Sequence, residues 1–175
     1  MIRAGLVGTV LLACLIYPGA CFATSLKDLQ IAVRIVGFLS KPPPVGSPLA
    51  VFFDSHSKDS RDDAQNIMAL LSGDADSAKT PLMPILVDLH NLEEAQGARV
   101  GLIALSSEAG YPAILEFAKK NAVLMISTDP ACVRAGICTA AVVSAPRVEV
   151  ILSRRVSEIS DVHFIEAFRM MVTEY

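Results

Sequence analysis

The sequence predicts an α/β fold in three layers, with a mostly parallel sheet and an antiparallel hairpin near the C-terminus. Short apolar runs typical of buried strands alternate with amphipathic segments long enough for helices, an order that favours a parallel sheet. Near the C-terminus two apolar runs instead flank the tight turn Ser144-Ala145-Pro146-Arg147. A short turn between strands can only join an antiparallel pair, so we expect this hairpin to extend one edge of the sheet.

The chain begins like a secretory signal. A basic start (Met1-Ile2-Arg3) leads into an apolar run that Pro18-Gly19 interrupts, and small residues end it at Ala23. This pattern predicts cleavage after Ala23, and the run is too short and interrupted for a comfortable membrane span. Cys14 resembles a lipidation site, but the tether that would follow it is apolar, which argues against a lipoprotein.

The predicted mature chain, residues 24–175, has the size of one domain. Removing 23 of the 175 residues leaves 152 and moves the formal net charge from −3 to −4, because Arg3 is the only charged residue lost. A chain of this length buries a sizeable core. Scattered basic residues give no footprint for nucleic acid and no basic face for a membrane surface. We therefore expect an exported protein that does not insert into the membrane.

Residues 26–39 are expected to form an unusually apolar helix. The apolar residues cover roughly 220° of the circumference at about 100° per residue, and Lys27, Gln30 and Arg34 hold the remaining arc. A surface helix usually needs a much narrower stripe. The helix is therefore either buried on two sides of its own domain or part of a partner interface. In the second case the contact residues are those beside the polar arc, namely Ile31, Ile35 and Phe38.

The remaining elements alternate as the fold class requires. The proline-rich stretch 41–48 is a stiff connector, and Ser60 with Asp63 resembles a capping box that opens a helix. Strands are expected at residues 49–53, 84–89, 100–105, 123–126, 139–143 and 148–152. Helices are expected at residues 61–71, 91–96, 109–120 (capped by 106–108), near Ser157, and at 162–173. Together they predict a single Rossmann-like domain.

Two cysteines, Cys132 and Cys138, remain after loss of the signal. An even count in an exported chain favours a disulfide. Such a short loop gains about 2–2.5 kcal/mol of stability on the chain-entropy estimate. The pair could instead be a redox-sensitive latch or two free thiols.

Motifs for catalysis, metals or cofactors are weak. The histidines His56, His90 and His163 lie in different segments without ligand spacing, and the two cysteines alone supply too few ligands for a metal. The sequence has no Gly-x-Ser-x-Gly elbow, and Ser55 beside His56 in a loop does not make a catalytic triad. No glycine-rich phosphate loop follows the first strand. We interpret Asp62 and Asp63 as acidic residues in the first turn of a helix, where they suit the helix dipole. We expect no metal, no cofactor and no enzymatic activity.

Three polar loops offer a possible ligand site. They follow expected strands and contain Ser55, Ser107, and Ser127 with Asp129. In open α/β sheets ligands lie beyond the carboxyl ends of the strands. A periplasmic small-solute-binding module is therefore one hypothesis, and a hydrolase built on the same loops is another.

The chain resembles the YfiR-like periplasmic regulator family. The opening helix 29–38, the strand and loop 123–127, the cysteines Cys132 and Cys138, and the strand 147–152 carry the resemblance. It implies a non-enzymatic repressor that binds the periplasmic sensor domain of a membrane-bound diguanylate cyclase. Such a protein lowers cyclic di-GMP and affects biofilm behaviour. The resemblance also implies a homodimer as the free state.

Overall fold

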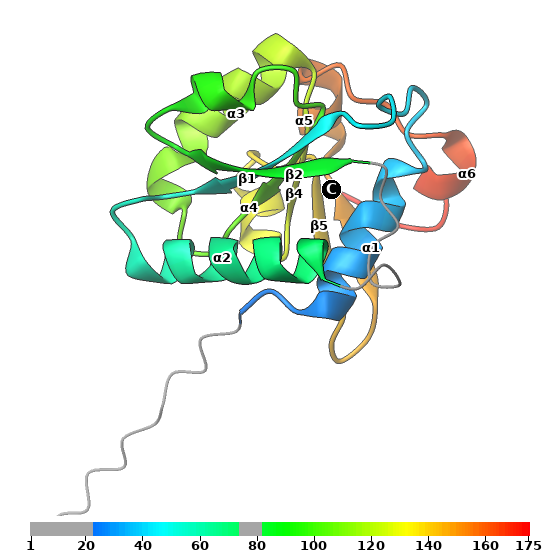
Figure 1. The fold of residues 1–175 in the computed structure, drawn as a ribbon. Coiled ribbons are helices and arrows are strands. Elements are labelled where there is room, and N and C mark those ends of the chain that lie inside the picture. Colours follow the sequence, from blue (N-terminus) through cyan, green and yellow to red (C-terminus); the bar gives the residue numbers. More distant parts are fainter. Residues whose placement is uncertain (1–22, 74–81) are drawn as a thin grey trace, which may run out of the picture.

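The computed structural model describes residues 23–73 and 82–175, and it confirms the predicted fold class (Figure 1). A seven-stranded sheet has the order β2-β1-β3-β4-β5-β6-β7. Strands β1 to β5 run parallel, β6 is antiparallel to β5, and β7 is parallel to β6. The strands are β1 Pro48–Phe53, β2 Met83–Asp88, β3 Val100–Ile103, β4 Leu124–Ser127, β5 Ala140–Val143, β6 Glu149–Leu152 and β7 Thr173–Glu174. Of the predicted signal segment, residues 1–22 lie outside the described part of the chain.

Helices cover both faces of the sheet, and each face has its own core (Figure 1). One face packs on α1 (Leu26–Val36) and α2 (Lys58–Ser72), and the other on α3 (Tyr111–Asn121) and α4 (Pro130–Arg134). Since neighbouring residues of a strand point to opposite faces, Val51 belongs to the first core and Phe52 to the second. This is the predicted three-layer arrangement.

Gly101 in β3 is required by packing. A Cβ at this position would lie 2.6 Å from Sδ of Met125 and 2.6 Å from Cε2 of Phe52. Both neighbours are fully buried, so neither can move aside without disturbing the core.

Helix α1 ends at Val36, three residues before the predicted end. It begins with a capping box, in which Ser25 Oγ accepts from the Asp28 amide at 3.2 Å and Asp28 Oδ2 accepts from the Ser25 amide at 3.1 Å. Beyond the helix Leu39 instead forms an antiparallel bridge with Phe164.

The predicted capping box at Ser60 and Asp63 is wrong, because α2 begins one turn earlier. Ser57 is the cap and accepts from the Ser60 amide at 3.2 Å. Asp63 is 4% exposed and serves as a buried hydrogen-bond acceptor, so it is not an exposed first-turn acid.

Two short helices confirm the prediction from the sequence, although their observed ends differ from the predicted ones. A 3₁₀ turn at Leu92–Ala95 occupies the predicted segment 91–96, and α5 (Arg154–Ile159) surrounds Ser157. Before α3 a second 3₁₀ turn spans Glu108–Gly110, and Ser107 makes no capping hydrogen bond.

The predicted helix at residues 162–173 is wrong. The segment contains only a short helix, α6 (Glu166–Arg169), and then forms β7. The Tyr175 amide donates to the Leu152 carbonyl at 2.7 Å, and the Arg154 amide donates to the Tyr175 carbonyl at 3.0 Å. Backbone groups of the C-terminal segment therefore hydrogen-bond to β6 and to the first residue of α5, instead of to one another within a helix. None of the described helices has the length and apolar character needed to cross a bilayer.

Candidate functional sites

The predicted ligand loops lie together at the carboxyl edge of the sheet, because β1, β3 and β4 are parallel neighbours. Their side chains, however, hold the loops in shape. Ser107 is buried, with its Oγ 2.7 Å from Ser60 Oγ. Ser127 Oγ accepts from the Asp129 amide at 3.0 Å, and Asp129 caps α4 by accepting from the Ala131 amide at 2.8 Å.

Ser55 likewise contacts the helix that follows its own loop. Its carbonyl accepts from the Arg61 guanidinium. Burial alone would raise the pKa of Asp88, but the hydrogen bonds from Ser55 and from the His90 amide hold that pKa below its usual value. A role for these four residues in binding a solute stays a prediction.

Two histidines that the sequence placed in unrelated segments meet at this edge. The rings of His56 and His90 have centroids 4.4 Å apart, and both face the carboxylate of Asp54. A sequence signal did exist, because Asp54-Ser55-His56 and Asp88-Leu89-His90 repeat the pattern Asp-x-His at two strand ends. Spacing along the chain could not reveal that the two strands are adjacent.

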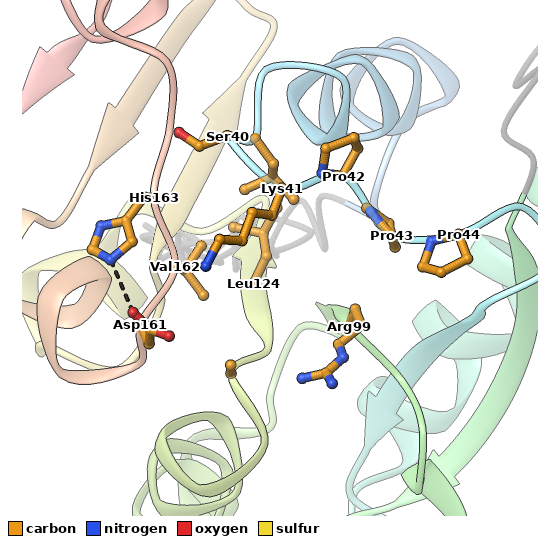
Figure 2. A pocket seen from close by; sticks show the side chains of 12 residues that line it. Ser40, Lys41, Pro42, Pro43, Pro44, Arg99, Leu124, Asp161, Val162 and His163 are labelled. Atoms are coloured by element: carbon orange, nitrogen blue, oxygen red, sulfur yellow. Dashed lines mark hydrogen bonds and ion pairs between the residues drawn. The ribbon is translucent and has the colours of Figure 1, made fainter.

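A pocket of about 320 Å³ opens at the opposite, amino edge of the sheet (Figure 2). Its walls come from the segment after α1, from the starts of β3 and β4, and from the segment after α5. The lining residues are Leu39, Ser40, Lys41, Pro42, Pro43, Pro44, Arg99, Ala122, Leu124, Asp161, Val162 and His163. None of the four predicted loop residues lines this pocket.

The pocket combines an apolar wall with basic side chains. In Figure 2 the prolines run along one side, Arg99 lies across from them, and the Lys41 side chain extends toward Val162 and Asp161. Arg99 is anchored by a 2.6 Å hydrogen bond from its Nη1 to the Asn121 carbonyl. The carboxylate of Asp161 lies 3.0 Å from His163 Nε2, so it already has a partner. Lys41 and Arg99 thus supply positive charge to a small cavity.

The three predicted partner-binding residues differ in how deeply they are buried. Ile35 is 1% exposed, so the expectation that it faces outward is wrong. Phe38 is half-buried and stacks on Phe168, with ring centroids 4.5 Å apart and planes 6° apart. Ile31 is also half-buried and packs on the same core. The first helix therefore uses most of its wide apolar arc within its own domain.

The two cysteines lie at disulfide-bonding distance, as predicted. The Cα atoms of Cys132 and Cys138 are 5.3 Å apart, and both side chains are fully buried. Burial is typical of a structural bridge, since labile bridges are usually strained or exposed.

Comparison with known proteins informs the fold alone. No family model and no curated protein matches the chain. Among solved structures it is similar to the ABC domain from Streptococcus pneumonia in complex with L-Trp, with a TM-score of 0.58, 11% identity, and coverage of 84% of this chain and 60% of that one. It is also similar to a conserved domain protein from Vibrio cholerae o1 biovar eltor, with a TM-score of 0.58, 9% identity, and coverage of 85% and 59%. The chain therefore spans about 60% of the length of the structures it resembles.

Proposed function

We propose that this protein is a small-solute-binding domain, and that the pocket at the amino edge of the sheet binds a small carboxylate with an apolar body, such as an amino acid. The observation that carries the proposal is the pocket itself, with Lys41 and Arg99 beside an apolar wall. Its volume of about 320 Å³ falls at the lower end of ligand sites, which begin at roughly 300 Å³.

The chemistry of the lining supports an anionic ligand. A guanidinium recognises a carboxylate through two parallel hydrogen bonds. Arg99 donates one Nη1 hydrogen bond to a carbonyl and keeps further donors for such a contact. The similarity to a domain in complex with L-Trp is consistent with this class of ligand.

A thermal-shift screen with L-amino acids and small carboxylates tests the proposal. A ligand that binds only the folded protein raises its melting temperature by mass action. For the best ligand we expect Arg99→Met to weaken the affinity by about tenfold or more, since it removes a charge-assisted contact.

Lys58→Met is the matched control. It also removes one positive charge, but Lys58 pairs with Asp62 at the start of α2, at the opposite edge of the sheet. Its affinity should equal that of the unmodified protein. If no carboxylate raises the melting temperature, or if both variants bind equally well, the pocket is not the binding site.

A protein-binding regulator is a second proposal. Exposed apolar side chains gather near the C-terminus, where Met170 is 80% exposed, Met171 69% and Tyr175 67%. Such side chains are typical of interaction surfaces when they form a patch. A homodimer contact, or contact with the sensor domain of a membrane-bound diguanylate cyclase as the YfiR resemblance implies, would use these exposed side chains.

A further inference from the structure

Two adjacent strand ends carry the same local structure. In Asp54-Ser55-His56 the aspartate Oδ1 accepts from the His56 amide at 2.8 Å, and in Asp88-Leu89-His90 the corresponding distance is 3.1 Å. Strands β1 and β2 pair in parallel, with Phe53 opposite Asp88. The repeated turn and this register bring the imidazoles of His56 and His90 together at one edge of the sheet.

The carboxylate of Asp54 completes a set of three ligand atoms. Its Oδ1 lies 3.7 Å from Nδ1 of His56 and 3.5 Å from Nε2 of His90, and the ligand atoms of the three residues all lie within 4.8 Å of one another. Four ligands around Zn²⁺ at bond lengths of about 2.0–2.1 Å lie about 3.3 Å apart. The two measured oxygen–nitrogen distances are close to that value.

Burial also suits a cation site. The Asp54 side chain is 12% exposed, whereas those of His56 and His90 are 78% and 55% exposed. The Asp54 amide donates to Ser60 Oγ at 3.0 Å, which fixes the backbone beneath the carboxylate. A fixed carboxylate below two accessible imidazoles leaves room for water or another donor in a fourth position.

We propose that Asp54, His56 and His90 bind one Zn²⁺ ion through three protein ligands, with the remaining position open to solvent. Two imidazoles and one carboxylate form a ligand set typical of zinc, whereas Ca²⁺ and Mg²⁺ prefer oxygen ligands alone. The site lies at the carboxyl edge of the sheet and shares no residue with the amino-edge pocket. It therefore stands independently of the solute-binding proposal.

Calorimetric titration of tag-free, chelator-treated protein with Zn²⁺ tests the site. We expect one ion per chain, and a loss of affinity of at least about tenfold in His56→Ala, in His90→Ala and in Asp54→Asn. Replacing residues that merely orient metal ligands already costs about 10- to 100-fold. His56 and His90 are exposed, so these two variants should retain the fold, which circular dichroism verifies.

His163→Ala is the matched control. His163 also lies beside an aspartate, with Nε2 3.0 Å from Asp161 Oδ1, but it belongs to no group of three ligands in the described part of the chain. Its zinc affinity should equal that of the unmodified protein.

Substitution with Co²⁺ reports on the coordination geometry of the site. Co²⁺ bound at the site should show the visible absorption of a four-coordinate ion, and His90→Ala should abolish this absorption. The proposal is overturned if Zn²⁺ does not bind saturably, or if binding survives in both His56→Ala and His90→Ala. Equal weakening by His163→Ala would equally overturn it, because it would indicate nonspecific binding to surface histidines.

Discussion

A single buried carboxylate, that of Asp63, joins the beginning of the described chain to the segment that follows β3. Asp63 accepts from the Thr24 amide at 2.7 Å, from the Thr24 hydroxyl at 2.9 Å and from the Leu105 amide at 3.0 Å. Thr24 itself is 3% exposed. If a leader is removed after Ala23, as the sequence predicts, the Thr24 amide becomes an ammonium group beside this carboxylate. The same residue would then bind the new N-terminus.

We expect Asp63→Asn to lower the free energy of unfolding by about 1–3 kcal/mol, the usual cost of leaving buried donors unpaired. The amide group of asparagine would face at least one of the three donors that the carboxylate accepts. Urea denaturation measures the change.

Asp62→Asn is the matched control for this experiment. Asp62 pairs with Lys58 at the surface, where its side chain is 56% exposed, and exposed pairs contribute at most about 1 kcal/mol. Equal urea midpoints for the two variants would show that the Asp63 network adds nothing to stability.

At the scale of elements, the wide apolar arc of α1 is explained by packing within the domain. Leu29, Ala32, Ile35 and Val36 are buried, and the chain beyond the helix places Phe38 on Phe168. Phe168 lies on α6, far from α1 in sequence but beside it through the Leu39–Phe164 bridge. The C-terminal segment thus covers a surface that the sequence could assign equally well to a partner.

Phe38→Ala should lower the free energy of unfolding by about 2–3 kcal/mol, below the 3–5 kcal/mol of a fully buried phenylalanine because Phe38 is half-buried. A double-mutant cycle with Phe168→Ala should give a coupling of about 0.5–1.5 kcal/mol, as expected of stacked rings. Urea midpoints of the four proteins supply these values.

Sedimentation of the Phe38→Ala variant distinguishes a role of Phe38 in partner binding from a role in the core alone. A change in self-association with unchanged stability would show that Phe38 contacts another molecule instead of Phe168. A loss of stability with unchanged association would leave α1 as a helix of the core.

At the scale of the whole molecule, an ion-pair network holds the C-terminus against the sheet. Glu174 accepts from Arg169 Nε at 2.6 Å and from Arg154 Nη2 at 2.6 Å. Hydrogen bonds from Arg169 and then from Arg154 lower the pKa of Glu174 to about 2. Because Glu174 belongs to β7, these contacts support the strand that ends the seven-stranded sheet.

This network predicts a pH dependence of stability. The pKa of Glu174 is lower in the folded protein than its ordinary value of 4.5, so its contribution is fully present above about pH 4.5 and is lost as the pH falls toward about 2. Glu174→Gln should therefore melt at a lower temperature than the unmodified protein at neutral pH. The difference in melting temperature between the two proteins should narrow as the pH falls from about 4.5 toward about 2.

Melting temperatures of both proteins across this range test the prediction. A gap that is the same at neutral pH and near pH 2 would show that the ionised carboxylate does not stabilise the fold.

The sequence by itself determined the local features of this protein. Alternating apolar runs gave the layers and every strand from β1 to β6, and the spacing of Cys132 and Cys138 indicated their pairing. These features depend on periodicity and on residues near one another in the chain, which the sequence displays directly.

Only the tertiary structure decided which distant residues meet. The parallel register of β1 and β2 brings His56 to His90, and the return of the C-terminus forms β7 and places Phe168 on Phe38. The order of strands in a sheet and the path of a terminal segment depend on hydrogen bonds and packing between residues far apart in sequence. Local patterns do not show which strands are adjacent, which is why the proposed zinc ligands and the amino-edge pocket could be recognised only in the folded chain.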